Sequence, residues 1–150
     1  MEAQEIKSYI NSFNALYKKC DDLYRSVARH LNISESGLWI LSSLAEEEKP
    51  ITQRILGEHL SQPRQTINSA IKNLESKNII QLVTLEGNQK EKRIVLTEIG
   101  EQFVQTNIIP VLNAERAIFK EMGKDESKEL LRLMQKYVGI YDEAIKEILI

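Results

Sequence analysis

Side chains that can read nucleic-acid bases are concentrated between residues 62 and 72. An arginine can donate two hydrogen bonds to guanine, and glutamine or asparagine can form two with adenine. Serine, threonine and lysine are suited to contacts with backbone phosphates. The candidates for contacts with DNA in this stretch are Gln62, Arg64, Gln65, Thr66, Asn68, Ser69 and Lys72.

An apolar stripe in the same stretch predicts that these side chains project from a helix. Its members recur at helical spacing and would form one buried face: Ile67, Ala70, Ile71 and Leu74. We expect Arg64, Asn68 and Lys72 to lie along the opposite face. The alternative is a polar face that is merely solvated.

A shorter helix is predicted just before this one, which makes a helix-turn-helix. Thr52 can cap this first helix. Because Pro63 fits only a first helical turn, the second helix would begin at Ser61 or Gln62. Gly57 is expected where the two helices cross closely, since only a small residue lets their backbones approach.

A short charged hairpin is predicted next, after Asn78 ends the helix in a left-handed conformation. Alternating β-branched residues predict strands from Ile80 to Leu85 and from Arg93 to Leu96, joined by a polar loop. Such a hairpin completes a winged helix. Basic side chains at its tip would reach a minor groove or phosphates, and a solvated turn is the alternative. The candidates are Lys90, Lys92 and Arg93.

Two apolar seams with a period close to 3.5 residues bracket the winged helix. The N-terminal seam consists of Ile6, Ile10, Phe13, Tyr17, Cys20, Tyr24, Val27 and Leu31. The C-terminal seam, whose helix would start near Gly123 or Asp125, consists of Leu130, Met134, Tyr137, Tyr141, Ala144 and Ile148. Each seam predicts a long helix that packs along another helix.

Three further signals divide the rest of the chain. Ser34 is a predicted N-cap for a short helix that runs to about Glu46. Thr97 is predicted to cap the helix after the hairpin. Pro110 should kink or divide that helix, because proline removes a backbone donor and clashes with the preceding turn.

Composition places the chain among ordinary folded proteins. Hydrophobic residues make up 42% of its 150 residues and charged residues 28%, which argues against disorder. No apolar run reaches the roughly 18 residues of a membrane span, and the polar start MEAQEIKSYI does not resemble a signal peptide. We therefore expect a cytoplasmic protein with no membrane partner.

The net charge of −2 hides an uneven distribution. Residues 49–93 contain eight lysines and arginines against four glutamates, a net charge of +4, so the remainder carries −6. A basic centre between acidic flanks fits a dimer that grips DNA through its middle segment.

The chain resembles the MarR family of bacterial winged-helix transcriptional regulators over essentially its whole length. The resemblance is carried by Leu31-Asn32-Ile33-Ser34, by the stretches LGEHL and TINSAIKNLESKNII, and by Leu96-Thr97 with Gly100. It implies a mainly α fold with a small β-hairpin wing, between N- and C-terminal helices that interlock in an obligate dimer. The implied organisation is a single domain over 1–150, with dimerisation helices at 1–33 and 111–150, a winged helix-turn-helix at 34–100 and a connecting helix at 97–113.

The resemblance also assigns residues. The family's DNA-reading positions fall on Arg64, Gln65, Thr66, Asn68 and Ser69. Its wing usually carries Asp-x-Arg, where this chain has Asn88-Gln89-Lys90. Asparagine cannot form an ion pair with arginine, and lysine lacks the planar fork of a guanidinium.

Members of the family respond to small apolar or phenolic molecules, to peroxides through a cysteine, or to metals. Cys20 lies on the apolar seam, where core packing is favoured over a redox role assisted by Lys18, Lys19 and Arg25. His30 and His59 have no partner at ligand spacing, so we predict no metal site and no cofactor. A small apolar or phenolic effector remains, and the aromatic residues expected at its pocket are Phe13, Tyr17, Tyr24, Trp39 and Phe103.

The sequence thus predicts a sequence-specific, DNA-binding transcriptional regulator, a ligand-responsive repressor that acts as a homodimer on a pseudo-palindromic operator. The alternatives are a winged-helix protein-interaction module without DNA binding, or a redox-responsive regulator that uses Cys20. No nucleophile and base pair, phosphate loop or metal cluster is apparent, so no enzyme is predicted.

Overall fold

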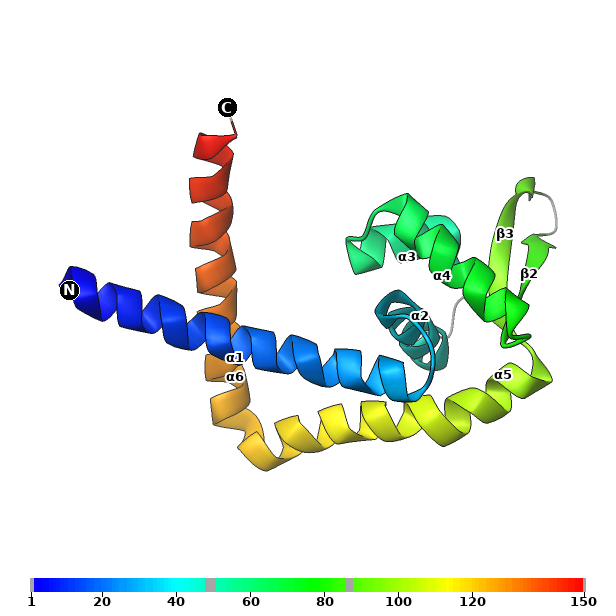
Figure 1. Ribbon diagram of the computed structural model, residues 1–150, viewed down its shortest axis with the longest axis horizontal. Helices are drawn as coiled ribbons and strands as arrows, with labels where there is room; N and C mark the ends of the chain where they lie inside the picture. Colours follow the sequence, from blue (N-terminus) through cyan, green and yellow to red (C-terminus); the bar gives the residue numbers. More distant parts are fainter. Residues whose placement is uncertain (1, 48–50, 86–87, 150) are drawn as a thin grey trace. The chain divides into compact units, whose positions relative to one another are not determined.

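The computed structural model describes residues 2–47, 51–85 and 88–149, with the backbone alone for residues 85 and 88–91. It divides into two compact units, Met1–Ile109 and Pro110–Ile150. The first contains a long helix, α1 (Ala3–His30), and a winged helix, which we call the winged lobe (residues 34–103) (Figure 1). The second contains most of α6 (Ile109–Ile148). The predicted mainly α fold with a small β wing is confirmed.

Two helices end in the same way, at an asparagine in the left-handed conformation. After α1, Asn32 has φ of 53°, and the Ile33 N–H donates to the Ala28 carbonyl at 3.0 Å. After α4 (Arg64–Ser76), Asn78 has φ of 55°, and the Ile79 N–H donates to the Leu74 carbonyl at 3.0 Å. These bonds satisfy carbonyls that a helix end leaves free, and they confirm the role predicted for Asn78.

The core of the winged lobe lies where α2 (Glu35–Glu46) packs against α4. Ser34 caps α2 as predicted, accepting the Gly37 N–H at 3.0 Å. The core side chains keep less than 2% of their surface exposed: Leu38, Ile40, Leu41, Leu56, Ile67, Ile71, Leu74 and Ile80. The apolar stripe predicted for α4 is therefore buried.

The start of α4 differs from the prediction. Thr52 caps α3 (Gln53–Leu60), but Ser61 then turns into the left-handed region with φ of 48°. Pro63 stays extended and precedes α4, and its carbonyl accepts the Thr66 N–H at 2.9 Å. The helix begins at Arg64, later than predicted, because Ser61 is left-handed and Pro63 is extended, so neither has a helical conformation.

The glycine that allows two backbone segments to approach closely is Gly100 and not Gly57. A Cβ on Gly57 would meet nothing within 4 Å among the described residues, so the predicted helix crossing at that position is wrong. A Cβ on Gly100 would lie 1.9 Å from the Ile79 carbonyl oxygen. Thr97 fixes this approach, since its N–H donates to Ile79 O at 3.1 Å and its hydroxyl accepts the Gly100 N–H at 3.0 Å. The N-terminus of α5 (Glu98–Phe103) thus docks on the turn after α4.

The wing belongs to a three-stranded antiparallel sheet in the order β1-β3-β2. The strands are β1 (Ile51–Thr52), β2 (Ile80–Leu85) and β3 (Asn88–Leu96). Ile51 pairs with Ile94 and Ile80 with Leu96. Sequence reasoning missed β1, which is only two residues long, and it started β3 five residues too late. Figure 1 shows the β2–β3 hairpin beside α4.

Pro110 produces a widened turn without dividing the helix. A π-helical turn at Val104–Ile108 joins α5 to α6, and the Ile109 N–H donates to the Val104 carbonyl five residues earlier. The helix is interrupted instead at Gly123, whose φ of 72° and ψ of 176° are a conformation that favours glycine (Figure 1). This agrees with the predicted helix start near Gly123 or Asp125. No helix in the described part of the chain is both long and apolar enough to cross a membrane.

Candidate nucleic-acid interface

The outward face of α4 is polar, but it is rotated from the face predicted. Each residue advances a helix by about 100°, so positions i, i+4 and i+8 drift by about 40° per step. Gln65, Ser69 and Lys72 lie opposite the buried stripe and are exposed. Arg64 is also exposed, although it lies on the flank toward α3.

Asn68 does not share this exposed face. Its side chain is half-buried, and its Oδ1 atom is buried without a hydrogen-bond partner among the described residues. The predicted line of Arg64, Asn68 and Lys72 therefore does not form a single exposed row. Gln65 is the exposed amide at the start of the helix.

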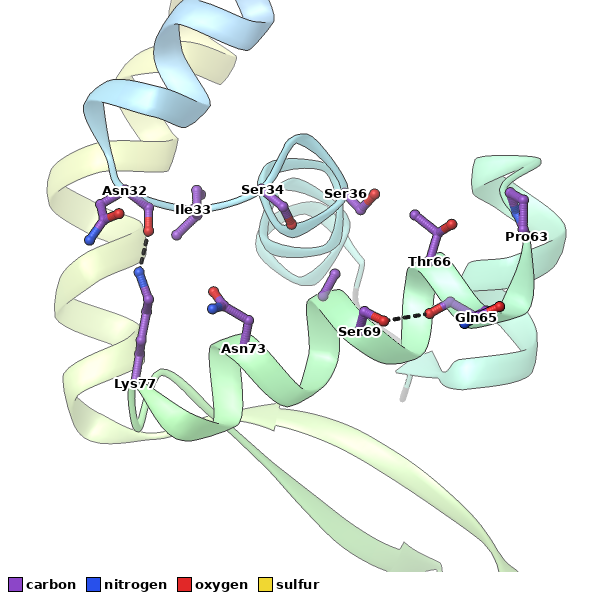
Figure 2. A pocket seen from close by; sticks show the side chains of 11 residues that line it. Asn32, Ile33, Ser34, Ser36, Pro63, Gln65, Thr66, Ser69, Asn73 and Lys77 are labelled. Atoms are coloured by element: carbon purple, nitrogen blue, oxygen red, sulfur yellow. Dashed lines mark hydrogen bonds between the residues drawn. The ribbon is translucent and has the colours of Figure 1, made fainter.

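A groove with a volume of about 810 Å³ runs along one side of α4 (Figure 2). Its walls come from α4 and the residue before it, from the turn that joins α1 to α2 and from the start of α2. Most of the lining residues have polar side chains, and the full set is Asn32, Ile33, Ser34, Ser36, Pro63, Gln65, Thr66, Ser69, Ala70, Asn73 and Lys77. The groove brings together the predicted Gln65, Thr66 and Ser69 with polar residues that sequence reasoning missed.

Hydrogen bonds hold α4 at both ends of the groove. At one end, the Ser36 hydroxyl donates to Gln62 Oε1 at 2.6 Å. At the other, Lys77 Nζ donates to the Asn32 backbone carbonyl, as the dashed line in Figure 2 shows. Gln62, predicted to contact DNA, is thus half-buried and engaged in positioning the turn. A left-handed asparagine follows each of the two helices linked here, and of Asn32 and Asn78 only Asn78 was predicted.

A second cavity of about 390 Å³ opens between α3 and α4. Two arginines and two glutamines line it, together with buried Ile67. The full lining is Gln53, Arg54, Gly57, Glu58, Gln62, Arg64 and Ile67. Arg54 Nη1 donates to Glu58 Oε1 at 2.9 Å.

The wing places two of its three predicted basic residues on the surface. Lys92 pairs with Thr84 and Arg93 with Val83 across the hairpin, and both side chains are exposed. The side chain of Lys90 lies outside the described residues. The polar face of α4 and the basic edge of the wing together offer groups for base edges and phosphates.

Solved structures of transcriptional regulators are similar to the chain over most of its length. NMB1585, a MarR family regulator from Neisseria meningitidis, aligns with a TM-score of 0.74 and 18% identity over 93% of this chain and 97% of its own. AbsC, a MarR family transcriptional regulator from Streptomyces coelicolor, aligns with a TM-score of 0.74 and 15% identity over 96% and 97%. The chain has the MarR fold.

The MepR–DNA complex from S. aureus is also similar. It aligns with a TM-score of 0.70 and 18% identity over 89% of this chain and 97% of that one. No protein-family model and no curated protein sequence matches the chain significantly. The likeness to MarR regulators is therefore one of fold.

The aromatic residues expected at a MarR effector pocket fall into two pairs. The Tyr24 and Trp39 rings lie 4.6 Å apart where α1 meets α2, and the Phe13 and Tyr17 rings lie 6.3 Å apart along α1. Phe103 is half-buried on α5. The two cavities beside α4 are lined by other residues.

Cys20 is exposed on α1 in the single chain, so its predicted packing against a second helix stays a prediction. The nearby Arg25 is engaged by Glu35 at 2.7 Å, by Asp21 at 2.7 Å and by Asp22 at 3.1 Å. The hydrogen bond to Glu35 is the main cause that raises the pKa of the guanidinium. Within the described part of the chain, no group of three or more His, Cys, Asp or Glu side chains is placed to hold a metal ion.

Proposed function

We propose that this protein is a sequence-specific, DNA-binding transcriptional regulator that acts as a homodimer. The observation that carries the proposal is the exposed polar face of α4, which lies in the winged lobe next to exposed Lys92 and Arg93 of the wing. A recognition helix of a helix-turn-helix enters the major groove and presents the residues of its first turns to base edges. The likeness of fold to MepR, which was solved as a complex with DNA, supports this proposal.

Arg64 and Gln65 are the proposed base readers. Both are exposed at the first turn of α4, where a guanidinium can pair with guanine and a carboxamide with adenine. Thr66, Ser69 and Lys72 are proposed to bind phosphates. Half-buried Asn68 has a smaller part in this proposal than its sequence position suggested.

The wing is proposed to add contacts with the phosphate backbone or the minor groove. Lys92 and Arg93 are exposed on β3 and project from the sheet that flanks α4. Their contribution is electrostatic and independent of sequence, so it should fall as the salt concentration rises. Lys90, nearer the tip, belongs to the same proposal.

The terminal helices support the homodimer. On α1, large apolar side chains are exposed in the single chain, with Tyr17 66% exposed and Ile10 54%. On α6 after Gly123, apolar residues cover about half of the helix circumference, which is wider than the seam of a two-helix coil. They are Leu130, Leu131, Leu133, Met134, Tyr137, Val138, Ile140, Tyr141 and Ile148.

A symmetric dimer would read a symmetric operator. Two recognition helices related by a two-fold axis contact half-sites whose centres lie about one helical turn, ~10–10.5 base pairs, apart. The operator should therefore be a pseudo-palindrome. We include in the proposal a small apolar effector that acts through the Tyr24–Trp39 contact, because α2 joins α1 to the recognition helix.

Selection of bound sequences from a random duplex pool tests the proposed function. The purified protein should recover a pseudo-palindrome, and Gln65→Ala should lose preference at one symmetric pair of positions, by about 1–3 kcal/mol. Gln102→Ala, an exposed glutamine on α5, is the matched control. Recovery of no common sequence, with no salt-dependent retention of duplex DNA and a co-purifying protein, would favour an interaction module instead.

A further inference from the structure

Gly123 interrupts α6 in a stretch that otherwise favours a continuous helix. Its φ of 72° and ψ of 176° lie in a region of backbone conformation that is essentially restricted to glycine, and α6 changes direction there (Figure 1). The flanking residues Glu121, Met122 and Lys124 are good helix formers. A Cβ on Gly123 would meet nothing within 4 Å among the described residues, so the backbone angles, and not a crowded neighbour, require the glycine.

Ser127 connects the two sides of this bend. Its Oγ lies 2.6 Å from the Gly123 carbonyl oxygen and 3.3 Å from the Phe119 carbonyl oxygen, and its hydroxyl can donate to either. The first bond is one that a serine within a helix makes with the carbonyl four residues earlier. The second reaches back to a residue that would be about 12 Å away in a continuous helix, so it exists only while α6 is bent.

The segment after the bend carries the apolar half of α6. Large apolar side chains there, such as Leu131 and Tyr141, are more than half exposed in the single chain. As a straight helix, residues 124–148 would be about 37 Å long, at about 1.5 Å per residue. The direction that α6 takes at Gly123 therefore decides where a long apolar surface lies and which chain can cover it.

We propose that Gly123 is a hinge, that Ser127 is its latch, and that the bent state commits α6 to a closed, two-fold dimer. This inference rests on the proposed homodimer and deepens it, because it names the device that directs the apolar half of α6. A straightened α6 carries the same surface about 37 Å beyond Gly123 along one axis. Elements extended in this way exchange between chains and give swapped or open-ended assemblies. The hinge therefore sets which assembly forms.

The decisive variant is Gly123→Ala, with Gly139→Ala as its control. Alanine is strained at the angles of Gly123 and favours the helix, so this variant should straighten α6. Gly139 has helical angles in the same helix, on the side away from the apolar residues at about 100° per residue. A Cβ on either glycine would meet nothing within 4 Å in the described part of the chain, so neither variant introduces a clash there.

The distance between two spin labels measures the bend. Asn113→Cys and Gln135→Cys, in a chain that carries Cys20→Ser, place the labels at exposed positions on either side of the hinge. Refolding with an excess of unlabelled chain leaves one labelled chain in each dimer. In a straight helix the two positions are about 33 Å apart. Gly123→Ala should give that distance by pulsed electron paramagnetic resonance, whereas the wild type and Gly139→Ala should give a shorter one.

The latch is tested by a pair of substitutions at Ser127. Ser127→Ala removes the hydroxyl and should show both distances, whereas Ser127→Thr keeps a hydroxyl and should show only the shorter one. A serine that merely stabilised the helix would not create a second distance. This pair also decides the proposal if Gly123→Ala does not fold.

Sedimentation over a dilution series measures the assembly of the same variants. For Gly123→Ala we expect the share of the wild-type dimer to fall about tenfold in favour of larger species, because alanine disfavours the bent state by at least that factor. Gly139→Ala should remain a dimer. A dimer that is unchanged although the labels move to the longer distance would overturn the link between the bend and the assembly.

The remaining outcomes separate this inference from the proposed function. The hinge is wrong if Gly123→Ala keeps the shorter distance, or if the wild type already shows the longer one. A wild type that is monomeric at every concentration overturns the inference together with the homodimer. A bent, dimeric wild type that shows no salt-dependent binding to duplex DNA overturns the proposed regulator and leaves the hinge in place.

Discussion

The winged lobe buries most of its large apolar side chains, whereas the terminal helices expose many of theirs. In the lobe, Leu38, Leu56 and Leu74 are at most 1% exposed, and hydrogen-bonded caps at Ser34 and Thr97 fix the ends of its helices. On α1 and on α6 after Gly123, many large apolar side chains are 37–75% exposed. The lobe contains its own core, whereas the terminal helices carry apolar surface that a partner would cover. In the proposed dimer, one chain would combine a DNA-binding lobe that has its own core with terminal helices that associate.

The largest expected effect is a break within the lobe. Gly100→Ala would place a Cβ 1.9 Å from the Ile79 carbonyl, and backbone cannot move aside as a flexible side chain can. We expect a loss of about 3 kcal/mol in the free energy of unfolding, measured by urea denaturation. Gly139→Ala, with open space around its Cβ, is the control and should not destabilise the protein. Equal stability of the two variants would show that α5 does not dock on the turn after α4.

The complementary change would affect association and spare the lobe. Met134 lies within the apolar half of α6, so Met134→Asp would bury a charge in the proposed dimer interface. We expect the dimer dissociation constant to rise by about 100-fold, measured by sedimentation over a dilution series. Gln135→Asp adds the same charge on the outer face of the helix and should have no effect. If both variants dissociate equally, the apolar half is not the interface.

These two regions also differ in how far the sequence predicts them. The caps at Ser34, Thr52 and Thr97 and the left-handed Asn78 depend on bonds within a few residues, so local patterns reveal them. The role of Gly100 depends on contact with Ile79, which lies 21 residues away in the chain, and no local pattern reports it. The strand β1 was missed for the same reason, because two residues become a strand only by pairing with β3.

In the candidate site, the sequence predicted the correct helix but not which of its residues share the exposed face. The sequence predicted which helix carries the polar face, but it assigned Arg64, Asn68 and Lys72 to one row. That spacing drifts by about 80° over two steps, so Arg64 lies on the flank toward α3, Lys72 lies on the outward face and half-buried Asn68 lies between them. Gln65 lies at the centre of the exposed face. Gly57 was given a steric role inside the fold because the spacing suited one. Only coordinates show that the space beside it is open.

The contact between α4 and the end of α1 can be tested by substituting Lys77. Lys77 follows α4 and donates to the Asn32 carbonyl after α1, so it links the winged lobe to a terminal helix. Lys77→Met should cost about 1 kcal/mol in stability. It should also relax the preferred half-site spacing, because α4 can then tilt relative to α1. Binding to operators lengthened or shortened by one base pair measures this.

The control for Lys77 is Lys72→Met, which removes an exposed lysine from the outward face of the same helix. A lysine that binds phosphate lowers the salt dependence of DNA binding by about one ion when it is removed. We expect that result for Lys72 and not for Lys77. The same loss of salt dependence in both variants would assign Lys77 to the DNA and not to the contact with the end of α1.

The smallest expected effect concerns a charge pair on the outer surface of α6. Glu129 accepts two hydrogen bonds from Arg132, both at 2.7 Å, and the bond from Arg132 is the main cause that lowers the pKa of Glu129. A carboxylate whose pKa is lowered by folding contributes stability above its unfolded pKa of about 4.3, and that contribution disappears as the pH falls through the folded value. The urea midpoint of the wild type should therefore exceed that of Glu129→Gln slightly at neutral pH, and the difference should vanish in acid. Because the pair is fully exposed, water and salt screen it, and the difference should also shrink as salt is added. A large, salt-independent difference would mean that this face of α6 is covered in the dimer, and the boundary between its apolar and polar halves would have to be redrawn.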